Sequence, residues 1–397
     1  MAEIKPDIET FAKIKVIGVG GGGGSAINRM INAKIKGVDF LAVNTDIQAL
    51  YASNAPIKLH IGKTITRGLG AGMDPEIGRK AAEESQNEIR DILKGADMVF
   101  ITCGLGGGTG SGASPVIAEI ARDLGALTIG IVTKPFSFEG VKRAEVAEEA
   151  LSDLSDKVDT IISIPNDKIL EIIDKKTSLL NAFLVSDNVL HQGVHGIAEI
   201  ITGAGLINVD FADVKTIMEG AGSSLMGVGE SKGENRAVEA AKMAIENPLL
   251  DLSIDGARGI LFTVSGGSSL TMNEVNEAAK IITQSADSEA KIIFGAIIDE
   301  NLKDSVRITV VATGFNEFCV KEFKDKTIQK VSDNFKINKV KINVKKEDKE
   351  GEEYNNQNIK HKNNIFVEKK QEKLTEEDVV EEKDELDIPA FIRKKMK

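Results

Sequence analysis

The chain has 397 residues, of which 42% are hydrophobic and 28% are charged, and its formal net charge is −11 at pH 7. This composition is typical of a globular protein, and the length allows two domains plus a tail. The acidic balance argues against nucleic acid as a partner, because it offers no broad basic surface to neutralise phosphates. No apolar run reaches the roughly 18 residues that span a bilayer, and Met1–Pro6 lacks the features of a signal peptide. We therefore expect a cytoplasmic protein without a membrane span.

From Phe11 to about Pro165, short apolar runs alternate with helical segments, which predicts an α/β fold with a doubly wound parallel sheet. Helices are expected after two glycine-rich turns, over Pro75–Leu93 and around Val141–Leu154. In such a sheet, ligands bind at the carboxyl ends of the strands. Five buried strands are expected: Ile14–Val19, Phe40–Asn44, Met98–Cys103, Leu127–Thr133 and Thr160–Ile164.

Two glycine clusters follow two of these strands. Gly20–Gly24 comes after the first strand, and Gly106–Gly112, with the sequence Gly-Gly-Gly-Thr-Gly-Ser-Gly, comes after Met98–Gly104. Backbone N–H groups of such loops close around a phosphate, and the helix that each loop opens adds a partial positive charge. No Lys-Ser/Thr pair of a Walker A loop follows either cluster. Two such loops in one sheet predict a site for a phosphorylated ligand.

An alternative interpretation rests on the first cluster alone. Gly18, Gly20 and Gly23 fit the dinucleotide-binding fingerprint, with Asp39 near the position of a ribose-binding acid. This pattern would indicate a nicotinamide-dependent oxidoreductase. It leaves the second glycine cluster unexplained.

A long helical pattern from Ser178 to Thr202 predicts a helix that leads out of the first domain. His191 and His195 lie four residues apart on it, which resembles half of a zinc site. The residues between them lack the Glu of His-Glu-x-x-His, and no third ligand is evident, so exposed helix surface is the preferred interpretation. Cys103 ends a buried strand without a partner base and is interpreted as a small hydrophobic residue.

The second half predicts an α+β domain with a mixed sheet from about Gly222 to Phe315. Its expected elements are helices at Glu234–Ile245 and Met272–Gln284, and strands at Gly259–Val264, Lys291–Ile298 and Val306–Thr313. Lys345–Glu385 is almost wholly polar and is predicted to be disordered. Apolar residues then return before a basic tip, which is typical of a docking peptide. This terminal segment contains Leu386, Asp387, Ile388, Pro389, Phe391, Ile392 and Arg393.

Several motifs in one order resemble the bacterial cell-division GTPases of the tubulin/FtsZ family. They are Gly20–Gly24, Val43–Asp46, Gly106–Gly112, Thr133–Phe136 and Asn208–Asp213, and the likeness covers residues 11–316 and resumes at Leu386–Arg393. The resemblance implies a tubulin-like fold with a long central helix. The implied organisation is a flexible N-terminus (1–10), a GTP-binding domain (11–178), the central helix (179–203), a catalytic loop and connection (204–221), a C-terminal α+β domain (222–316), a disordered linker (317–385) and a partner-binding peptide (386–397).

The resemblance also implies roles for individual residues. The glycine loops and Thr109 would hold the phosphates, Glu139 and Arg143 the ribose, and Phe183 the base. Asp187 and Asn166 would read guanine, because a carboxylate accepts from its two adjacent N–H donors. Ser25 stands where the family usually has Asn. The implied GTP-binding set is Gly20, Gly21, Gly22, Gly23, Gly24, Ser25, Asn44, Asp46, Ala71, Gly72, Gly104, Gly106, Gly107, Gly108, Thr109, Gly110, Thr133, Pro135, Glu139, Arg143, Asn166, Phe183 and Asp187.

Asn208, Asp210 and Asp213 are the implied catalytic residues. Asp210 also fits a helix cap before Phe211, but a cap explains only one of the three polar groups. The family resemblance implies that this loop completes the site of the next subunit in a head-to-tail homopolymer, with Mg²⁺ at the phosphates. It further implies a division ring at mid-cell, tethered to the membrane by division proteins that bind the terminal peptide. A scaffold that does not hydrolyse GTP is the remaining alternative, and it has no need for both aspartates.

Overall fold

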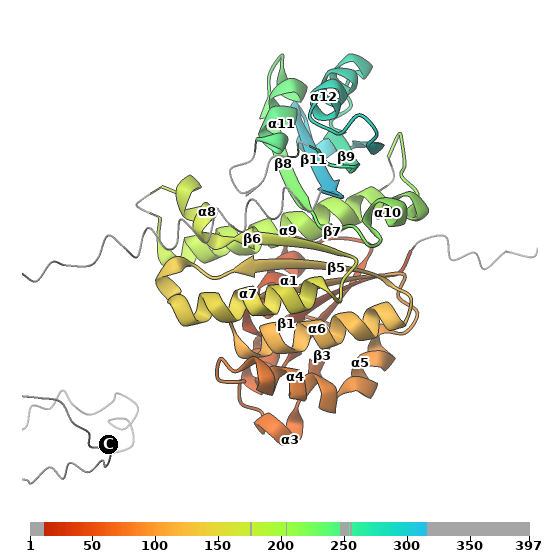
Figure 1. Ribbon diagram of the computed structural model, residues 1–397. Helices are drawn as coiled ribbons and strands as arrows, with labels where there is room; N and C mark the ends of the chain where they lie inside the picture. The colour runs from red at the N-terminus through yellow and green to blue at the C-terminus, as the bar shows by residue number, and fades with distance from the viewer. Residues whose placement is uncertain (1–11, 175–176, 204, 247–253, 255, 316–397) are drawn as a thin grey trace, which may run out of the picture. The chain divides into compact units, whose positions relative to one another are not determined.

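The computed structural model describes residues 12–174, 177–203, 205–246, 254 and 256–315. The first part of this region is a seven-stranded, wholly parallel sheet in the order β3-β2-β1-β4-β5-β6-β7 (Figure 1). Its strands are β1 (Ile14–Val19), β2 (Val38–Asn44), β3 (Ile57–His60), β4 (Met98–Gly104), β5 (Leu127–Lys134), β6 (Thr160–Pro165) and β7 (Gly222–Ser223).

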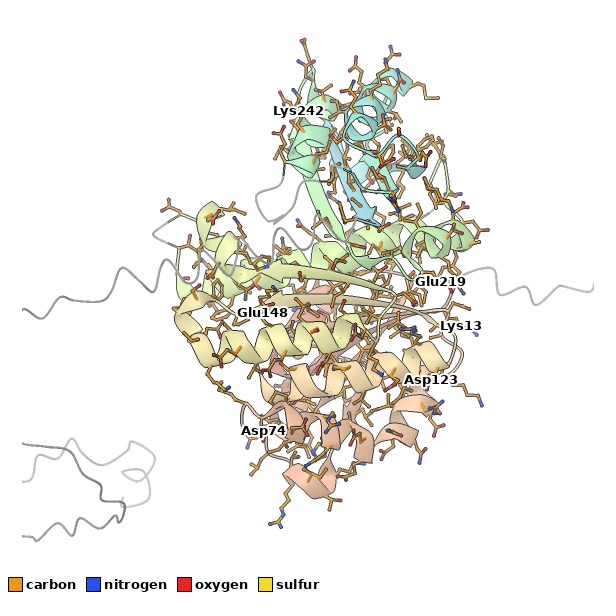
Figure 2. The ribbon with its side chains drawn as sticks, in the orientation of Figure 1. Lys13, Asp74, Asp123, Glu148, Glu219 and Lys242 are labelled. Carbon is orange, nitrogen blue, oxygen red and sulfur yellow. The ribbon has the colours of Figure 1, made fainter. Side chains whose placement is uncertain are left out.

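Both faces of this sheet are covered by helices, which explains why its strands read as continuous apolar runs. In β4, Met98 and Phe100 pack into the cluster on the face of α1 (Gly20–Asn32) and α9 (Leu179–Thr202). Val99 and Ile101 pack on the opposite face. That face is covered by α4 (Pro75–Glu84), α5 (Gln86–Leu93), α6 (Gly108–Asp123) and α7 (Val141–Ser155). Figure 2 shows charged side chains such as Glu148 and Asp123 projecting from the outer helices.

The five strands predicted for this domain are confirmed, β1 with the same ends as predicted. The prediction of one continuous helix over Pro75–Leu93 is wrong, because the backbone leaves helical geometry at Ser85. The buried Ser85 hydroxyl accepts a hydrogen bond from the Gly62 N–H at 3.4 Å, so the break serves a contact with a neighbouring loop. The short elements β3, β7, α2 (Ile47–Ala52), α3 (Lys63–Thr66) and α8 (Asn166–Ile172) were not predicted, and neither was the eight-residue strand β8 (Leu225–Lys232).

Helix α9 has 24 residues and packs on both of its long sides. A Cβ atom at Gly193 would lie 3.2 Å from the Ile131 side chain of β5. One at Gly196 would lie 2.7 Å from Thr309 of β11 (Ser305–Thr313). Two glycines three residues apart therefore let α9 approach the first sheet on one side and a second sheet on the other.

The second sheet is mixed, as the sequence predicts for this region. Its strand order is β10-β9-β11-β8. Helix α10 (Phe211–Met218) follows α9 and precedes β7, the edge strand of the first sheet. The other strands of the second sheet are β8 (Leu225–Lys232), β9 (Gly259–Gly266) and β10 (Lys291–Ile298). The helices between the strands are α11 (Arg236–Ile245), α12 (Met272–Gln284) and the 3₁₀ turn η2 (Glu300–Leu302). The predicted strand Lys291–Ile298 and helix Met272–Gln284 have the ends expected.

An ion pair joins α11 to α12. The Arg236 guanidinium, which is 8% exposed, donates to both carboxylate oxygens of Glu274 at 2.6 and 3.3 Å. It also donates to Ser269 and to the Asp304 carbonyl. The Arg236 hydrogen bonds hold the pKa of Glu274 at about 2, and the capping bonds from Thr271 add to this effect.

Replacing Glu274 by Gln should lower the free energy of unfolding by about 3 kcal/mol, because it leaves the Arg236 charge without its counter-ion in a low-dielectric site. Urea unfolding followed by circular dichroism at pH 7.5 would measure this. Because the pKa of Glu274 is depressed in the folded state, its contribution is present above about pH 4.5 and is lost as the pH falls toward 2. The matched control is Glu148→Gln, which breaks an exposed pair with Lys134 and should cost less than about 1 kcal/mol. Equal losses in the two variants would contradict the assignment.

Candidate nucleotide site

The two glycine clusters end neighbouring strands of the first sheet. Gly20 opens α1 directly after β1, and Gly107 is the N-cap of α6 shortly after β4. Neither Val19 nor Gly107 caps its helix with a side chain, and neither helix has an acidic residue in its first turn. The first N–H groups of both helices are therefore left for an outside acceptor, and both helix dipoles favour an anion at this point.

The two loops contact each other through their backbones. Gly20 has φ +71°, and a Cβ atom there would lie 3.0 Å from the Gly110 nitrogen. A Cβ atom at Gly22 would lie 3.2 Å from the Gly104 nitrogen. At Gly21, Gly24 and Gly107, in contrast, it would meet no atom within 4 Å. The glycines thus allow the loops to touch on one side and leave open space on the other, as a phosphate site requires.

A third loop packs onto the start of α6. The Ala71 side chain is buried, and a Cβ atom at Gly108 would lie 2.8 Å from the Ala71 Cβ. Gly72 and Met73 both have positive φ, +60° and +64°. Asp74 then caps α4 by accepting from the Glu76 N–H at 2.9 Å. The structure therefore brings the predicted residues Ala71 and Gly72 next to the second glycine loop.

Thr109 is held in place by a residue that the sequence analysis did not assign to the site. Its hydroxyl lies 2.7 Å from that of the fully buried Thr45, in the loop after β2. Asn44 and Asp46, which were predicted to bind nucleotide, make hydrogen bonds that stabilise the local backbone. The Asn44 side chain accepts from the Asp46 N–H, and Asp46 caps α2 by accepting from Gln48 at 2.8 Å. Thr45 belongs to the Val43–Asp46 motif, but the sequence analysis gave this residue no role of its own.

The loop after β5 forms another wall. Thr133 is buried beside Gly104, and a Cβ atom at Gly106 would lie 2.7 Å from the Arg143 carbonyl and 3.4 Å from the Pro135 ring. The Glu139 carboxylate pairs with the Arg143 guanidinium at 3.0 Å and accepts from the Phe136 N–H at 2.9 Å. Glu139, Arg143 and the second glycine loop are thus adjacent.

The residues predicted to bind the base come from α8 and the first half of α9. Phe183 packs edge-on against Phe136 with ring centroids 5.4 Å apart. The buried Asn166 accepts from the Ser186 hydroxyl at 2.7 Å, one residue before Asp187. Burial raises the pKa of Asp187 to about 6, and the Arg29 charge partly opposes this shift. Ser25 is exposed on α1.

Asn208, Asp210 and Asp213 lie at the other end of the first sheet. The Thr202 side chain at the end of α9 packs against Gly37, which precedes β2, and the Met218 carbonyl at the end of α10 accepts from Thr160, which begins β6. These are the amino ends of the strands. Figure 2 shows Glu219, just after α10, and Lys13, just before β1, on the side away from Asp74 of the third loop.

The predicted cap at Asp210 is only partly right. Asp210 occupies the N-cap position of α10, but its side chain makes no capping hydrogen bond. All three predicted catalytic side chains are exposed. The carboxylates of Asp210 and Asp213 are therefore free of a capping role in this helix, whereas the Asn208 amide oxygen accepts from the Gly205 N–H at 2.7 Å.

The strand order cannot by itself decide against the dinucleotide alternative, because β3-β2-β1-β4-β5-β6 is also the order of dinucleotide-binding sheets. Asp39 decides against it. A ribose-binding acid belongs at the carboxyl end of β2. Asp39 is instead the second residue from the amino end of β2, where it lies opposite Lys15 of β1 in the strand register.

Comparison with known proteins agrees with this geometry. Residues 13–174 match the model described as "Tubulin/FtsZ family, GTPase domain", and residues 222–316 match "FtsZ family, C-terminal domain". A solved FtsZ dimer from M. jannaschii is 49% identical, with a TM-score of 0.74, over 77% of this chain and 89% of that one. The chain belongs to the FtsZ family.

As a member of the FtsZ family, the chain carries the family's GTPase domain on the first sheet. A second M. jannaschii FtsZ structure, of a point mutant, is also 49% identical, over 77% of this chain and 92% of that one, with a TM-score of 0.74. CetZ2 from Haloferax volcanii is 20% identical over 81% of this chain and 99% of that one, with a TM-score of 0.68, and shares the fold. No helix in the described part of the chain is long and apolar enough to cross a membrane. The predicted terminal peptide, Leu386–Arg393, lies outside the described residues.

Two smaller predictions can be compared with the structure. Cys103 is buried, which raises the pKa of its thiol to about 11 and agrees with its interpretation as a small hydrophobic residue. His191 and His195 do not lie on open helix surface, since both are half-buried and line a cavity. Within the described ranges, no group of three or more His, Cys, Asp or Glu residues is placed to hold a metal ion.

The raised pKa of Asp187 predicts a pH-dependent nucleotide affinity. Guanine donors bind the carboxylate and not the acid, so GDP affinity should fall about fourfold between pH 7.0 and 5.5 for this reason. Titration of a fluorescent GDP analogue would measure it. Because the phosphates of GDP also titrate, Asp187→Asn is the reference: it should bind more weakly at pH 7.0 and lack this fourfold component. An identical pH profile in both proteins would exclude the guanine-reading role.

Proposed function

We propose that the chain hydrolyses GTP in a site shared by two copies, in which one supplies the glycine loops and the next supplies Asn208, Asp210 and Asp213. The separation of these groups within one chain carries this proposal. The glycine loops lie at the carboxyl ends of the strands and α10 lies at the amino ends. Helix α9 spans between these ends with 24 residues, about 36 Å at 1.5 Å per residue. No side chain bridges that distance, which supports a loop supplied by a neighbouring copy.

The residues on the nucleotide side position the substrate. The free N–H groups at the starts of α1 and α6 would hold the phosphates, with the Thr109 hydroxyl oriented by Thr45. Phe183 would contact the base, and Asp187 would accept from guanine. Most of phosphoryl-transfer catalysis is positioning and charge stabilisation, so these donors stabilise the charge that develops on the phosphate oxygens.

The loop of the next copy would act on the water. Its Asp210 and Asp213 carboxylates accept hydrogen bonds from the attacking water and orient it in line with the γ-phosphate, with Asn208 beside them. Asp210 is available for this because it does not cap α10. A loop supplied by a second molecule makes hydrolysis depend on assembly.

Such a contact is heterologous, so repeating it produces an open head-to-tail filament. Exposed apolar side chains at both ends support this. Tyr51, on α2, and Leu69, after α3, are 79% and 71% exposed, and Leu206, close to Asn208, is 76% exposed. In the proposed filament, the contact between copies would cover these side chains. The similar M. jannaschii FtsZ structure is described as a dimer.

We also propose Mg²⁺ as the metal ion of the reaction, where it would supply positive charge at the phosphates. Mg²⁺ usually takes one or two protein ligands plus phosphates and water. This fits the described residues, which contain no ready cluster of three acidic or histidine ligands. The hydroxyl groups of Thr109 and Thr45, which lie 2.7 Å apart, would face it.

In the cell, we place the filaments in the cytoplasm, in the cytokinetic ring at the mid-cell division site. The ring would be tethered to the membrane by division proteins that bind Leu386–Arg393. The apolar residues of that segment, followed by a basic tip, support a docking role.

The rate of GTP hydrolysis per molecule should be near zero at low protein concentration and rise above a threshold, together with light scattering. This follows because each active site needs two copies. Phosphate release with Mg²⁺ over a range of protein concentrations would measure it. A constant rate per molecule without scattering would mean that each chain has a complete site, and the shared-site proposal would be wrong.

A mixture of two inactive variants gives a sharper test. Asp213→Asn should lower the rate about a hundredfold or more while GTP still binds. Gly107→Glu should abolish binding, because its carboxylate enters the open space at the start of α6 and repels the phosphates. Mixed in equal amounts, they should recover up to about a quarter of the native rate, since one contact in four joins an intact pocket to an intact loop. No recovery, with both variants still assembling, would argue against a site formed by two copies.

Deleting Leu386–Lys397 should leave the GTPase rate and assembly within about twofold of the intact chain, because the proposed partner peptide is not part of the site. Sedimentation and phosphate release would measure both. A strong loss of assembly would place the segment in the filament contact.

A further inference from the structure

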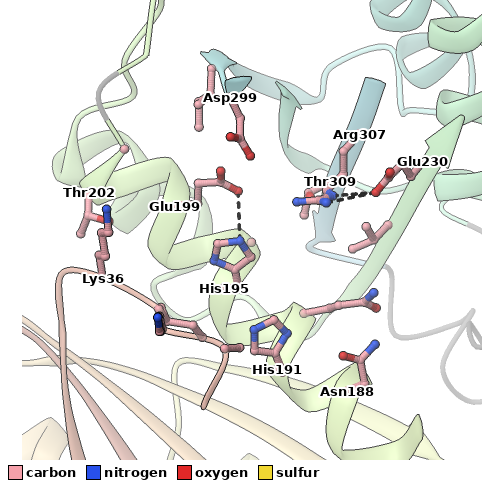
Figure 3. Close-up of a pocket in the computed structure, with 18 of the residues that line it drawn as sticks. Lys36, Asn188, His191, His195, Glu199, Thr202, Glu230, Asp299, Arg307 and Thr309 are labelled. Carbon is pink, nitrogen blue, oxygen red and sulfur yellow. Dashed lines mark hydrogen bonds and ion pairs between the residues drawn. The ribbon is translucent and has the colours of Figure 1, made fainter. Parts of the chain in front are cut away.

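Helix α9 and the second sheet border a cavity of about 820 Å³ (Figure 3). His191 and His195 reach it from α9, Glu230 from β8 and Arg307 from β11. The Arg307 guanidinium pairs with the Glu230 carboxylate at 3.0 Å, so these two charges satisfy each other. His191 and His195 are the two imidazole side chains among the residues that line this cavity.

The histidines stack on each other. Their ring centroids are 5.5 Å apart, with an angle of 28° between the planes. His195 has a carboxylate partner, since its Nε2 lies 3.7 Å from an oxygen of Glu199. Figure 3 shows this pair, with His191 on the other side of His195 from Glu199.

His191 has no such support. Its Nδ1 atom is buried and has no hydrogen-bond partner. A neutral imidazole tolerates this when Nδ1 carries no proton, whereas a protonated imidazole has N–H donors at both nitrogens. Protonation would therefore leave a buried donor unpaired, which a folded contact avoids.

The charges around the cavity add to this effect. Burial lowers the pKa of His191 to about 4, followed by the effects of the positive charges of His195, Arg29 and Arg307. Other charged residues face the cavity from every neighbouring element. They are Glu199 on α9, Lys34 and Lys36 before β2, Glu230 on β8, Asp299 after β10, Glu300 in η2 and Arg307 on β11.

We propose that the packing of α9 against β8 and β11 is a proton-sensitive contact, which closes when His191 is neutral and loosens when His191 takes up a proton. Water that enters the loosened contact would pair the Nδ1–H. The contact matters for function because α9 carries Asp187 in its first half and leads into the loop of Asn208. The inference concerns this packing alone and holds whether or not the filament proposal does.

The direction of the pH effect follows from the linkage between proton binding at His191 and the packing of α9. An imidazole in water has a pKa of about 6.5, and His191 in the closed contact has one of about 4, so protons bind more tightly to the loosened state. At pH 6.0 the equilibrium should shift toward the loosened state about fourfold, and at pH 7.5 hardly at all.

Hydrogen exchange of the full chain without nucleotide, at pH 7.5 and 6.0, tests this. After correction for the intrinsic pH dependence of exchange, protection in α9 residues 190–202, β8 and β11 should fall about fourfold at pH 6.0. Peptides from β4 and α6 should not change. In His191→Gln, which does not titrate, the fall should disappear, and in His60→Gln, which alters a histidine on β3, it should remain.

The outcomes separate His191 from other groups. Asp187 also lies on α9 with a raised pKa, but it is retained in His191→Gln, so the difference between the two proteins reports His191 alone. If His191→Gln is poorly protected even at pH 7.5, His191→Phe offers a larger side chain without a titrating group, and its pH dependence decides the question. Equal loss of protection in the native chain and the His191 variants, or no loss in the native chain, would overturn the proposal. A failure of the GTPase experiments would leave this result unaffected.

Discussion

The nucleotide site depends on a direct backbone contact between two glycine loops at the ends of β1 and β4. Gly20 and Gly110 come so close that a side chain at Gly20 would press on the Gly110 backbone. This approach brings the N-termini of α1 and α6 together, so that two sets of unpaired N–H groups face the same open space. The loops that carry Ala71 and Thr45 pack around that pair, together with Arg143 at the start of α7. If the loops were a few ångströms further apart, the two helix dipoles would no longer act on the same phosphates.

Helix α9 sets the second constraint. Gly193 and Gly196 let it lie close to β5 on one side and β11 on the other, so its position is fixed by two sheets. Its first half presents Asp187 near the nucleotide loops, and its end directs Asn208–Asp213 to the amino ends of the strands. In the proposed mechanism, a helix of this length keeps the glycine loops and Asn208–Asp213 apart within one chain.

Some charged residues of the first part of the chain stabilise local structure, whereas others are exposed and free to contact another molecule. Asp46 and Asp74 cap helices, and Glu139 holds Arg143 and the Phe136 N–H. These residues shape the loops even if they also touch nucleotide. Asp210 and Asp213 differ, because both are exposed and Asp210 makes no cap bond. The pair of Arg236 and Glu274, which joins α11 to α12, is structural.

The sequence by itself determined the parallel sheet, the glycine loops and the long helix, because these depend on local signals: apolar runs, glycine content and helical periodicity. It also predicted the polar loop at Asn208–Asp213 and, through resemblance, the residues around the base. Only the tertiary structure decided which groups meet. The pairing of Thr109 with Thr45, the break at Ser85 and the buried Nδ1 of His191 all depend on contacts between segments far apart in the chain. Asp39 fitted a fingerprint by its spacing, but its position along β2 placed it at the wrong end of the strand. Spacing along a chain constrains what is possible, whereas the direction of a strand and the packing of its neighbours fix where each side chain lies.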